Sequence, residues 1–373
     1  MQRPIQAYRL FFPAATLFAL GAIPVWALEY AGFLPAVRGG GSGSWHGHEM
    51  VFGYAFAVIA GYLLTKISRR ALAAVFVLWL LGRVTYLLLP LPPLIDAAIS
   101  ISFPLCLSLL AGMPFLRATK TWRNAVFLVI LAGLALAALA YQSGVLGALV
   151  AGQARGVGLG VNVITLLMFT MGGRVIAAAT SGALQEKDMH LHGMAQPRLE
   201  QAGVAAIIAL ALFDFWGHAP YMAAAAALAA AAAEVMRLFR WRIWKVADHA
   251  DLLSLHIGYA WLAVGLAAQS VALGFGFLSP SDALHGVTVG ALGTLSLAMM
   301  AHVSLQRSQR PIVFPPYVTL AVATISGAAL CRLLAALPAL RLAMIAGAGI
   351  CWMLAFGLFA IFLVRVPMTR AGR

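Results

Sequence analysis

Charged residues are scarce in this sequence. Only 10% of its 373 residues are Asp, Glu, Lys or Arg, whereas 63% are hydrophobic. A soluble domain of this length carries roughly 25% charged residues. The mean hydropathy is +0.93, and many apolar runs are long enough to cross the ~30 Å hydrocarbon core of a bilayer. The composition excludes an ordinary soluble domain and predicts an all-α polytopic membrane protein, because helices satisfy their own backbone hydrogen bonds in lipid.

Cysteine is equally rare. The three cysteines, Cys106, Cys331 and Cys351, lie singly in apolar segments, and no C-x-x-C pair occurs. The pattern supports neither a disulfide framework nor a thiolate metal site. No C-x-x-C-H motif is present either, so any electron donor of the cytochrome c type has to be external to the chain.

Long hydrophobic runs, in contrast, are abundant. Runs bounded by Gly, Pro and charge clusters predict twelve transmembrane helices in one integral membrane domain, 1–373. The first run has no small-residue cleavage site after it, so we expect a spanning helix and not a removed signal peptide. The predicted spans lie near 11–28, 46–65, 71–90, 93–116, 122–141, 157–180, 200–217, 219–238, 252–274, 282–304, 313–337 and 339–364.

Basic residues supply the predicted orientation. With the N-terminus in the cytoplasm, most of the 25 Lys and Arg residues fall at the inner ends of the spans. Only Arg38, Arg155, Arg332 and Arg341 fall outside, and Arg83 lies within the third span. The positive-inside rule therefore predicts that both termini are cytoplasmic. The same rule accounts for the net charge of +14 as a set of topology signals that face membrane lipid, and not as a nucleic-acid site.

Three protonatable groups stand together in "SGSWHGHEMVFGY", residues 42–54, where a glycine-rich stretch enters the second span. On an ideal helix His46 and His48 point about 200° apart. Either the chain is extended there, with Gly47 allowing the bend, or the two rings serve different centres. Glu49 lies on the same helical face as His46 and is expected to orient that ring. Capping of the helix and contact with lipid headgroups is the simpler reading for any single interfacial histidine.

Further histidines lie at other span ends. His285 stands at the outer end of the tenth span, and with His46 and His48 it forms an outer set that favours a metal or haem site. His256, in "LLSLHIGYAW", lies deeper, and both a ligand and a satisfied core histidine remain open. His302 closes the tenth span on the inner side, where it needs no ligand.

Two arginines lie within the apolar spans. Arg83, in "WLLGRVTY", needs an anion or water at its depth. Haem propionates would suit its guanidinium, and Asp96 or Asp214 would serve as purely structural partners. Arg174, in "MGGRVI", lies near the inner surface, where extension of the side chain to the interface accounts for it.

These segments together resemble a known family. "WHGHEMVFGYAFAVIAGYLLT" is similar to the W-H-A-H-E-M-L-F-G-F signature of the NnrS family. Further matches follow in the same order along essentially the whole chain: "LWLLGR", "GGRVI", "LHIGYAWLAVGL" and "ALHGVTVGALGTLSLAMM".

The resemblance implies a twelve-span protein of the bacterial inner membrane that contains haem, of b type, and copper. The family is associated with denitrification and with resistance to nitric oxide. Its histidines correspond here to His46, His48, His256 and His285, and its intramembrane arginines to Arg83 and Arg174. Reduction of nitric oxide would need electrons, and because the chain has no C-x-x-C-H motif, we expect a quinol or an external donor to supply them. Glu49 is the nearest group to these histidines that can carry a proton, and we expect proton transfer to be its catalytic role.

The chain departs from the family pattern on the cytoplasmic side. After the tenth span it reads "MAHVSLQRSQR", which places His302 where the family has Arg and lacks the G-H-T-G motif. The chain thus resembles a divergent member of the NnrS family. Two other functions stay open: a twelve-span secondary transporter, which predicts polar groups at the midplane, and a sensor that binds nitric oxide without turnover.

Overall fold

Helices make up all the regular secondary structure in the part of the chain that the computed structural model describes. That part covers residues 6–35, 41–65, 67–88, 91–117, 122–189 and 196–366. The chain divides into two compact units, Met1–Ile164 and Thr165–Arg373, and α7 (Gly152–Gln185) contains the boundary. The predicted all-helical class is confirmed.

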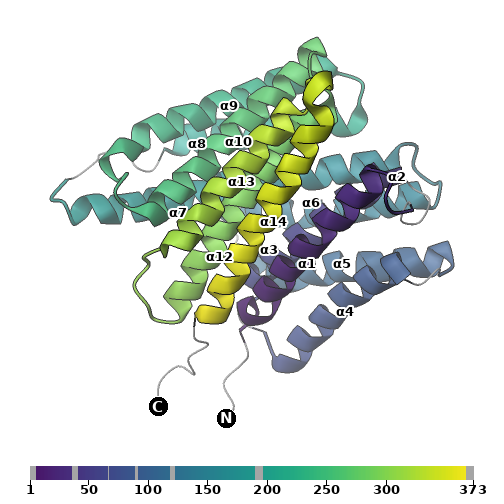
Figure 1. Cartoon of the computed structure of the whole chain (residues 1–373), viewed down its shortest axis with the longest axis horizontal. Coiled ribbons are helices and arrows are strands. Elements are labelled where there is room, and N and C mark those ends of the chain that lie inside the picture. The colour runs from purple at the N-terminus through teal and green to yellow at the C-terminus, as the bar shows by residue number, and fades with distance from the viewer. Residues whose placement is uncertain are drawn as a thin grey trace. The chain divides into compact units, whose positions relative to one another are not determined.

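The first unit consists of the N-terminal helices and the beginning of α7 (Figure 1). Its other elements are α1 (Tyr8–Tyr30), α2 (Gly41–His48), η2 (Glu49–Ala55), α3 (Phe56–Leu63), α4 (Arg69–Leu88), α5 (Pro93–Arg117) and α6 (Trp122–Val145). The segments α2, η2 and α3 follow one another without a break. The middle one is a π-helix, in which each turn holds one residue more than in an α-helix.

Glycines let α7 approach the other helices of this unit closely. A Cβ on Gly160 would lie 2.7 Å from Cγ1 of Val51 in η2, and one on Gly156 would lie 2.7 Å from Cα of Tyr141 in α6. Real side chains do not tolerate such distances, so these two positions require glycine. The first half of α7 is thereby packed against both η2 and α6.

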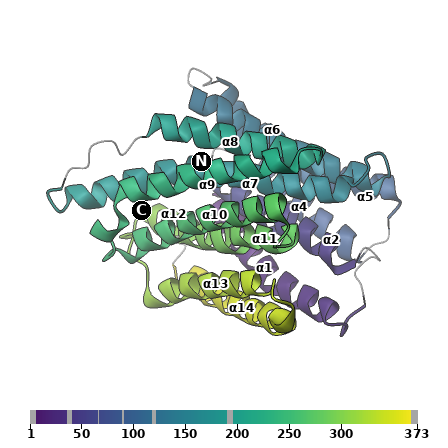
Figure 2. The same cartoon turned by 90° about the horizontal axis from the view of Figure 1, so that it is seen from above.

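The second unit holds the remaining helices. They are α8 (Pro197–Trp216), α9 (Pro220–Trp241), η3 (Ile243–Lys245), α10 (Ala250–Phe275), α11 (Pro280–His285), η4 (Gly286–Gly293), α12 (Thr294–Arg307), α13 (Pro316–Leu334), η5 (Pro338–Leu340) and α14 (Arg341–Arg365). The π-helix η4 joins α11 and α12 without a break. In two views, α9 lies beside α8 and α13 lies beside α14 (Figures 1 and 2).

Local sequence accounts for the ends of these helices. Proline, whose ring fixes φ and whose missing N–H is not needed there, is the first residue of α5, α8, α9, α11 and α13. Gly217 and Gly276 end α8 and α10 with φ of +71° and +68°, a left-handed conformation that suits glycine. The alanine-rich α9 buries Ala223, Ala227 and Ala230 almost completely, so its neighbours can pack closely against it.

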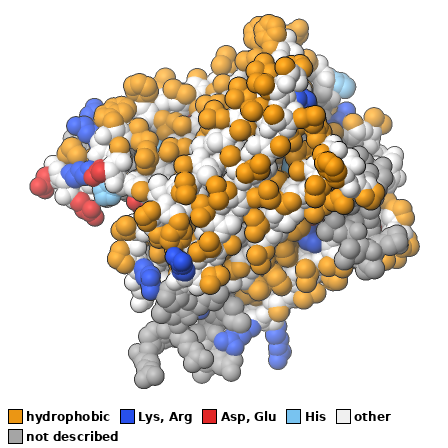
Figure 3. Space-filling view, viewed as in Figure 1, with side chains coloured by type: hydrophobic (Ala, Val, Ile, Leu, Met, Phe, Trp, Pro, Cys, Tyr) orange, Lys and Arg blue, Asp and Glu red, His pale blue; other side chains and the backbone are white. Residues whose placement is uncertain are grey.

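Ten helices in the described part of the chain are long and apolar enough to cross a membrane. The other two predicted spans, 46–65 and 71–90, coincide with α2–η2–α3 and with α4, which fall outside that set. The count of twelve and the cytoplasmic termini therefore stay predictions. Hydrophobic side chains cover most of the face shown in Figure 3, as expected of helices that face lipid.

Candidate functional site

A buried chain of three polar side chains lies in the first unit. Nδ1 of His48 and Oε1 of Glu49 are 2.8 Å apart, and Nε of Arg83 lies 3.0 Å from Oε2 of the same carboxylate. The three side chains are 2%, 0% and 7% exposed. With Nδ1 held by a carboxylate, Nε2 is the ring nitrogen that would coordinate a metal, and the carboxylate would raise its electron density.

The π-helix η2 begins at Glu49 and shapes this chain of contacts. Its widened hydrogen-bond pattern changes the partners of the backbone carbonyls, and the carbonyl of Gly53 accepts a hydrogen bond from Nε1 of Trp79 at 2.9 Å. A Cβ on Gly53 would lie 2.7 Å from a terminal nitrogen of Arg83. Glycine at this position therefore leaves room for the guanidinium beside Glu49.

Two aromatic rings separate the environments of the histidines in "HGH". His46 stacks on Trp26 of α1, with ring centroids 4.4 Å apart, whereas His48 packs on Tyr141 of α6 at 4.5 Å. The segment is helical through His48. An extended chain, the first of our two alternatives, is therefore wrong. The rings face different helices, which agrees with the second alternative.

Two expectations about partners also need correction. We expected Glu49 to orient His46, but its carboxylate bonds the ring of the adjacent His48, and the ring of His46 is occupied by its stacking on Trp26. We named Asp96 and Asp214 as structural partners for Arg83. The ion pair is instead with Glu49.

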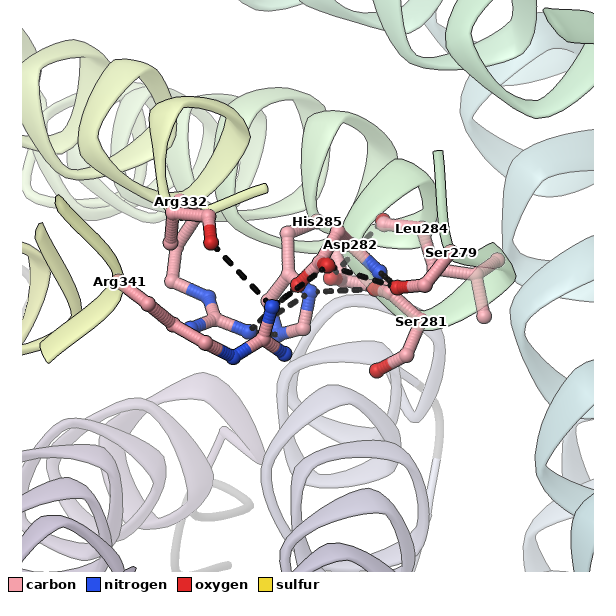
Figure 4. A network of polar contacts seen from close by, with 9 residues as sticks. Ser279, Ser281, Asp282, Leu284, His285, Arg332 and Arg341 are labelled. Carbon is pink, nitrogen blue, oxygen red and sulfur yellow. Dashed lines mark hydrogen bonds and ion pairs between the residues drawn. The ribbon is translucent and has the colours of Figure 1, made fainter. Parts of the chain in front are cut away.

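A second polar network surrounds His285 in the other unit (Figure 4). Its Nδ1 lies 2.6 Å from the carbonyl oxygen of Ser281, to which it can donate. One guanidinium nitrogen of Arg332 lies 3.1 Å from Nε2 and 3.3 Å from Nδ1 of the ring. The arginine therefore lies against the histidine, and π-helix η4 starts at the next residue.

Asp282 connects this network to α13 and α14. Its backbone N–H donates to Oγ of Ser279 at 3.0 Å, and that hydroxyl donates back to its carboxylate at 2.7 Å, which caps α11. Nη1 of Arg341 donates to the same carboxylate at 3.2 Å, and Arg332 lies 3.8 Å away. The carboxylate is 2% exposed, so these contacts hold a buried charge in place.

The deeper His256 is fully buried in α10. Its Nε2 lies 3.1 Å from Oγ1 of Thr180, and its ring meets Trp241 edge-on at 6.0 Å. Among the described residues, its Nδ1 has no hydrogen-bond partner. The ring is thus partly satisfied, and its two readings, ligand and core histidine, both stay open.

The remaining candidates lie elsewhere in the second unit. Nε of Arg174 is 3.7 Å from Oε1 of Glu200. Its side chain is 29% exposed, while that of Glu200 is 4% exposed, so a buried acid adds to the interfacial placement that we expected. His302 is half-buried in α12, and its Nδ1 has no hydrogen-bond partner within the described residues.

Four histidines were expected to bind haem or copper, and each lies in its own environment. His46 and His48 lie in the first unit, and His256 and His285 in the second. No group of three or more His, Cys, Asp or Glu side chains that could hold a metal occurs among the residues that the structure describes. The binding of haem or copper by these histidines stays a prediction.

Sequence reasoning missed several residues of these networks. Arg332 was read only as an outer topology signal, and Tyr141 and Asp282 were not considered at all. A signal for Asp282 was present, because "SPSD" places an N-cap serine three residues before it and six before His285. Nothing comparable marks Tyr141, whose place beside His48 depends on the packing of α6.

Helices of this length and hydropathy define a multi-pass helical membrane protein with buried histidine networks. The model of the family described as NnrS protein matches residues 5–370, nearly the whole chain, so the protein belongs to the NnrS family. That membership indicates a membrane protein of the nitric oxide response. No curated protein matches the chain.

Proposed function

We propose that this protein is a haem- and copper-containing protein of the bacterial inner membrane that binds or transforms nitric oxide. The observation that carries the proposal is the buried chain His48–Glu49–Arg83. A carboxylate on the far nitrogen of a histidine is the usual support of a metal-bound imidazole, because it fixes the tautomer and the ring orientation. Helix packing alone gives no reason to bury these three groups together.

Particular residues would hold each part of the cofactor. Nε2 of His48 would be the principal ligand, and His46, His256 and His285 are further candidates. Arg83 and Arg174 would neutralise carboxylates of a bound haem, although each also has an acid of the chain within 4 Å. Bound haem iron or copper would supply an open coordination position for nitric oxide and a change of oxidation state.

Glu49 has a separate role in this proposal. Its carboxylate lies between a histidine and an arginine, so a negative charge on it is paired with the guanidinium of Arg83 and stabilised by the hydrogen bond to His48. It holds the His48 ring in one orientation and can exchange a proton with Nδ1 of that ring. Electrons would come from quinol or an external donor, since the chain has no motif for a covalently bound c-type haem.

The test is an optical spectrum and a metal analysis of the protein purified from membranes of cells supplied with haem and copper. We expect a Soret band and stoichiometric iron, with copper in addition. A colourless, metal-free and correctly folded preparation would exclude the proposal and favour a transporter. Addition of nitric oxide and a reductant then separates the remaining alternatives: consumption of the gas indicates an enzyme, and a stable spectral change without consumption indicates a sensor.

A further inference from the structure

Another buried acid lies outside the networks of His48 and His285, in the alanine-rich helix α9. The side chain of Glu234 is 0% exposed. Neither of its carboxylate oxygens makes a hydrogen bond of normal length and angle with a residue that the structure describes, although the hydroxyl of Tyr259 lies close enough to act on it. An ionised carboxylate without well-formed hydrogen bonds is strongly disfavoured in such a place, because burial removes its hydration. The burial therefore favours the neutral, protonated form of this side chain.

The nearest cation makes its hydrogen bonds elsewhere. Nη1 of Arg237, one turn along α9, donates to the carbonyl of Phe169 at 3.2 Å and to the hydroxyl of Tyr259 at 2.8 Å. The guanidinium also lies over the rings of Phe169, Trp241 and Tyr259, with centroid distances of 4.6, 5.2 and 5.7 Å. Three aromatic faces and a carbonyl thus stabilise its charge, and no carboxylate is needed at rest.

The hydroxyl of Tyr259, from α10, belongs to the same group of contacts. It donates to the carbonyl of Phe169 at 2.8 Å, and it also acts on the carboxyl of Glu234 as a hydrogen-bonding neighbour. The groups that act on Glu234 are therefore Arg237 on its own helix and Tyr259 from α10. Glu200 from α8, whose partner is Arg174, acts electrostatically on Tyr259.

Two glycines of the "GGRVI" segment make room for this cluster. A Cβ on Gly172 would lie 2.7 Å from the ring of Tyr259, and one on Gly173 would overlap the guanidinium of Arg237. The next residue, Arg174, pairs with Glu200. The two glycines of this segment thus leave space for the α9 cluster, which consists of Glu234, Arg237, Tyr259 and the carbonyl of Phe169.

We propose that Glu234 is a proton-binding site, a buried carboxylic acid that is neutral at rest and gives up its proton when Arg237 turns towards it. In the release step the O–H bond breaks and the proton passes to a water molecule. The negative charge left on Glu234 is compensated by the guanidinium, which exchanges its bonds to Phe169 and Tyr259 for the carboxylate. Uptake reverses these changes. The site needs no bound haem or copper.

Infrared spectroscopy of the protein in lipid nanodiscs tests this proposal directly. A protonated carboxylic acid gives a C=O stretching band well separated from the bands of ionised carboxylates. We expect such a band in the wild type, its loss in Glu234→Gln, and a downshift when the protein is equilibrated in D₂O. A band that Glu234→Gln leaves unchanged, or no band at all, would overturn the proposal, and a band that D₂O never shifts would contradict release of the proton.

Two matched controls assign the band. Glu200→Gln removes a buried acid that is paired with Arg174, so the carboxylic acid band should stay. Glu29→Gln removes a buried acid that also lacks a hydrogen bond among the described residues, and the part of the signal lost in Glu234→Gln should stay here too. If Glu234→Gln does not fold, Tyr259→Phe provides a second reading: it removes the adjacent hydroxyl, and a band that belongs to Glu234 must change frequency.

The two proposals fail independently. Absence of haem and copper from the purified protein would end the proposed function and leave the infrared band unaffected. Absence of the band would end the present inference and leave the optical spectrum unaffected.

Discussion

The two histidines that precede the π-helices differ in what holds the ring. Nδ1 of His48 lies on the carboxylate of Glu49, whereas Nδ1 of His285 lies on a backbone carbonyl with a guanidinium against the ring. A carboxylate increases the electron density that the opposite nitrogen can offer a metal, and a neighbouring cation opposes it. Of these two rings, His48 is therefore the better candidate for a strong ligand, although the sequence places each in a similar setting.

The acids in the two networks differ in parallel. One carboxylate oxygen of Glu49 contacts the ring of His48, and the other contacts Arg83. Asp282 contacts a serine and the arginines of α13 and α14, and its role is to cap α11 and hold the helix ends together. The first network is therefore arranged around the imidazole ring of His48, and the second around the N-terminus of α11.

The largest effect is expected at the first network. Replacement of His48 by Ala removes the proposed principal ligand, and we expect the purified variant to lose its Soret band. His218→Ala is the matched control, because His218 is exposed and belongs to neither network. Optical spectra normalised to protein concentration give the measurement. If the His48→Ala protein still bound a full complement of haem, the conclusion that His48 is a better ligand candidate than His285 would be wrong.

The arginines of the second network should differ in their effect on stability. Arg332→Ala removes the buried guanidinium that lies against His285 and 3.8 Å from the carboxylate of Asp282, and loss of one member of a buried ion pair costs about 3 kcal/mol or more. The side chain of Arg341 is 41% exposed, and loss of a partly solvated pair costs about 0–1 kcal/mol. Denaturant unfolding in detergent compares the variants. Equal losses would contradict the structural role assigned to this network.

A weaker test concerns the carboxylate on His48. Glu49→Gln keeps the size of the side chain and removes its charge, and loss of such a support typically weakens metal binding about 10–100-fold. Titration of the apoprotein with haem measures the affinity, and Asp282→Asn provides the comparison. If both substitutions weakened binding equally, the distinction between the two acids would not hold.

The smallest effect is expected at an exposed pair outside the spans. Nζ of Lys187 donates to Asp248 at 2.7 Å, and this hydrogen bond holds the pKa of the Asp248 carboxyl below its ordinary value of 3.8. The pair therefore stabilises the folded state above about pH 4, and the contribution disappears as the pH falls below that value. The melting temperatures of wild type and Asp248→Asn should differ slightly at neutral pH and converge in acid. Divergence in acid would show that the sign is wrong.

Much of the candidate site could be read from the sequence, but not the pairing within it. His48, Glu49 and Arg83 all stand out as protonatable or charged groups in apolar runs. Their contacts did not follow, because α-helical spacing assigns Glu49 to His46, whose ring instead stacks on Trp26 of another helix. The hydrophobic pattern of this segment predicts neither that contact nor the π-helix that begins at Glu49.

The buried acid of α9 escaped notice for a different reason. Glu234 and Arg237 precede Arg240, Arg242 and Lys245, and together they resemble an ordinary basic segment at a span end. Only the structure separates them: Glu234 and Arg237 are 0% and 3% exposed, whereas Arg240, Arg242 and Lys245 are exposed. Burial inside a helix bundle depends on which neighbours cover a turn, and no local pattern records that.

The two π-helices have a consequence for how this protein can change over evolutionary time. A π-helix holds about one residue more in each turn than an α-helix, which frees backbone carbonyls from their usual partners. Deletion of a single amino acid between 49 and 55 would let the segment return to regular α-helical coiling, in which the carbonyl of Gly53 would bond within the helix and not to Trp79. Single-residue deletions in η2 and η4 are therefore expected to remove backbone contacts that point substitutions nearby leave in place.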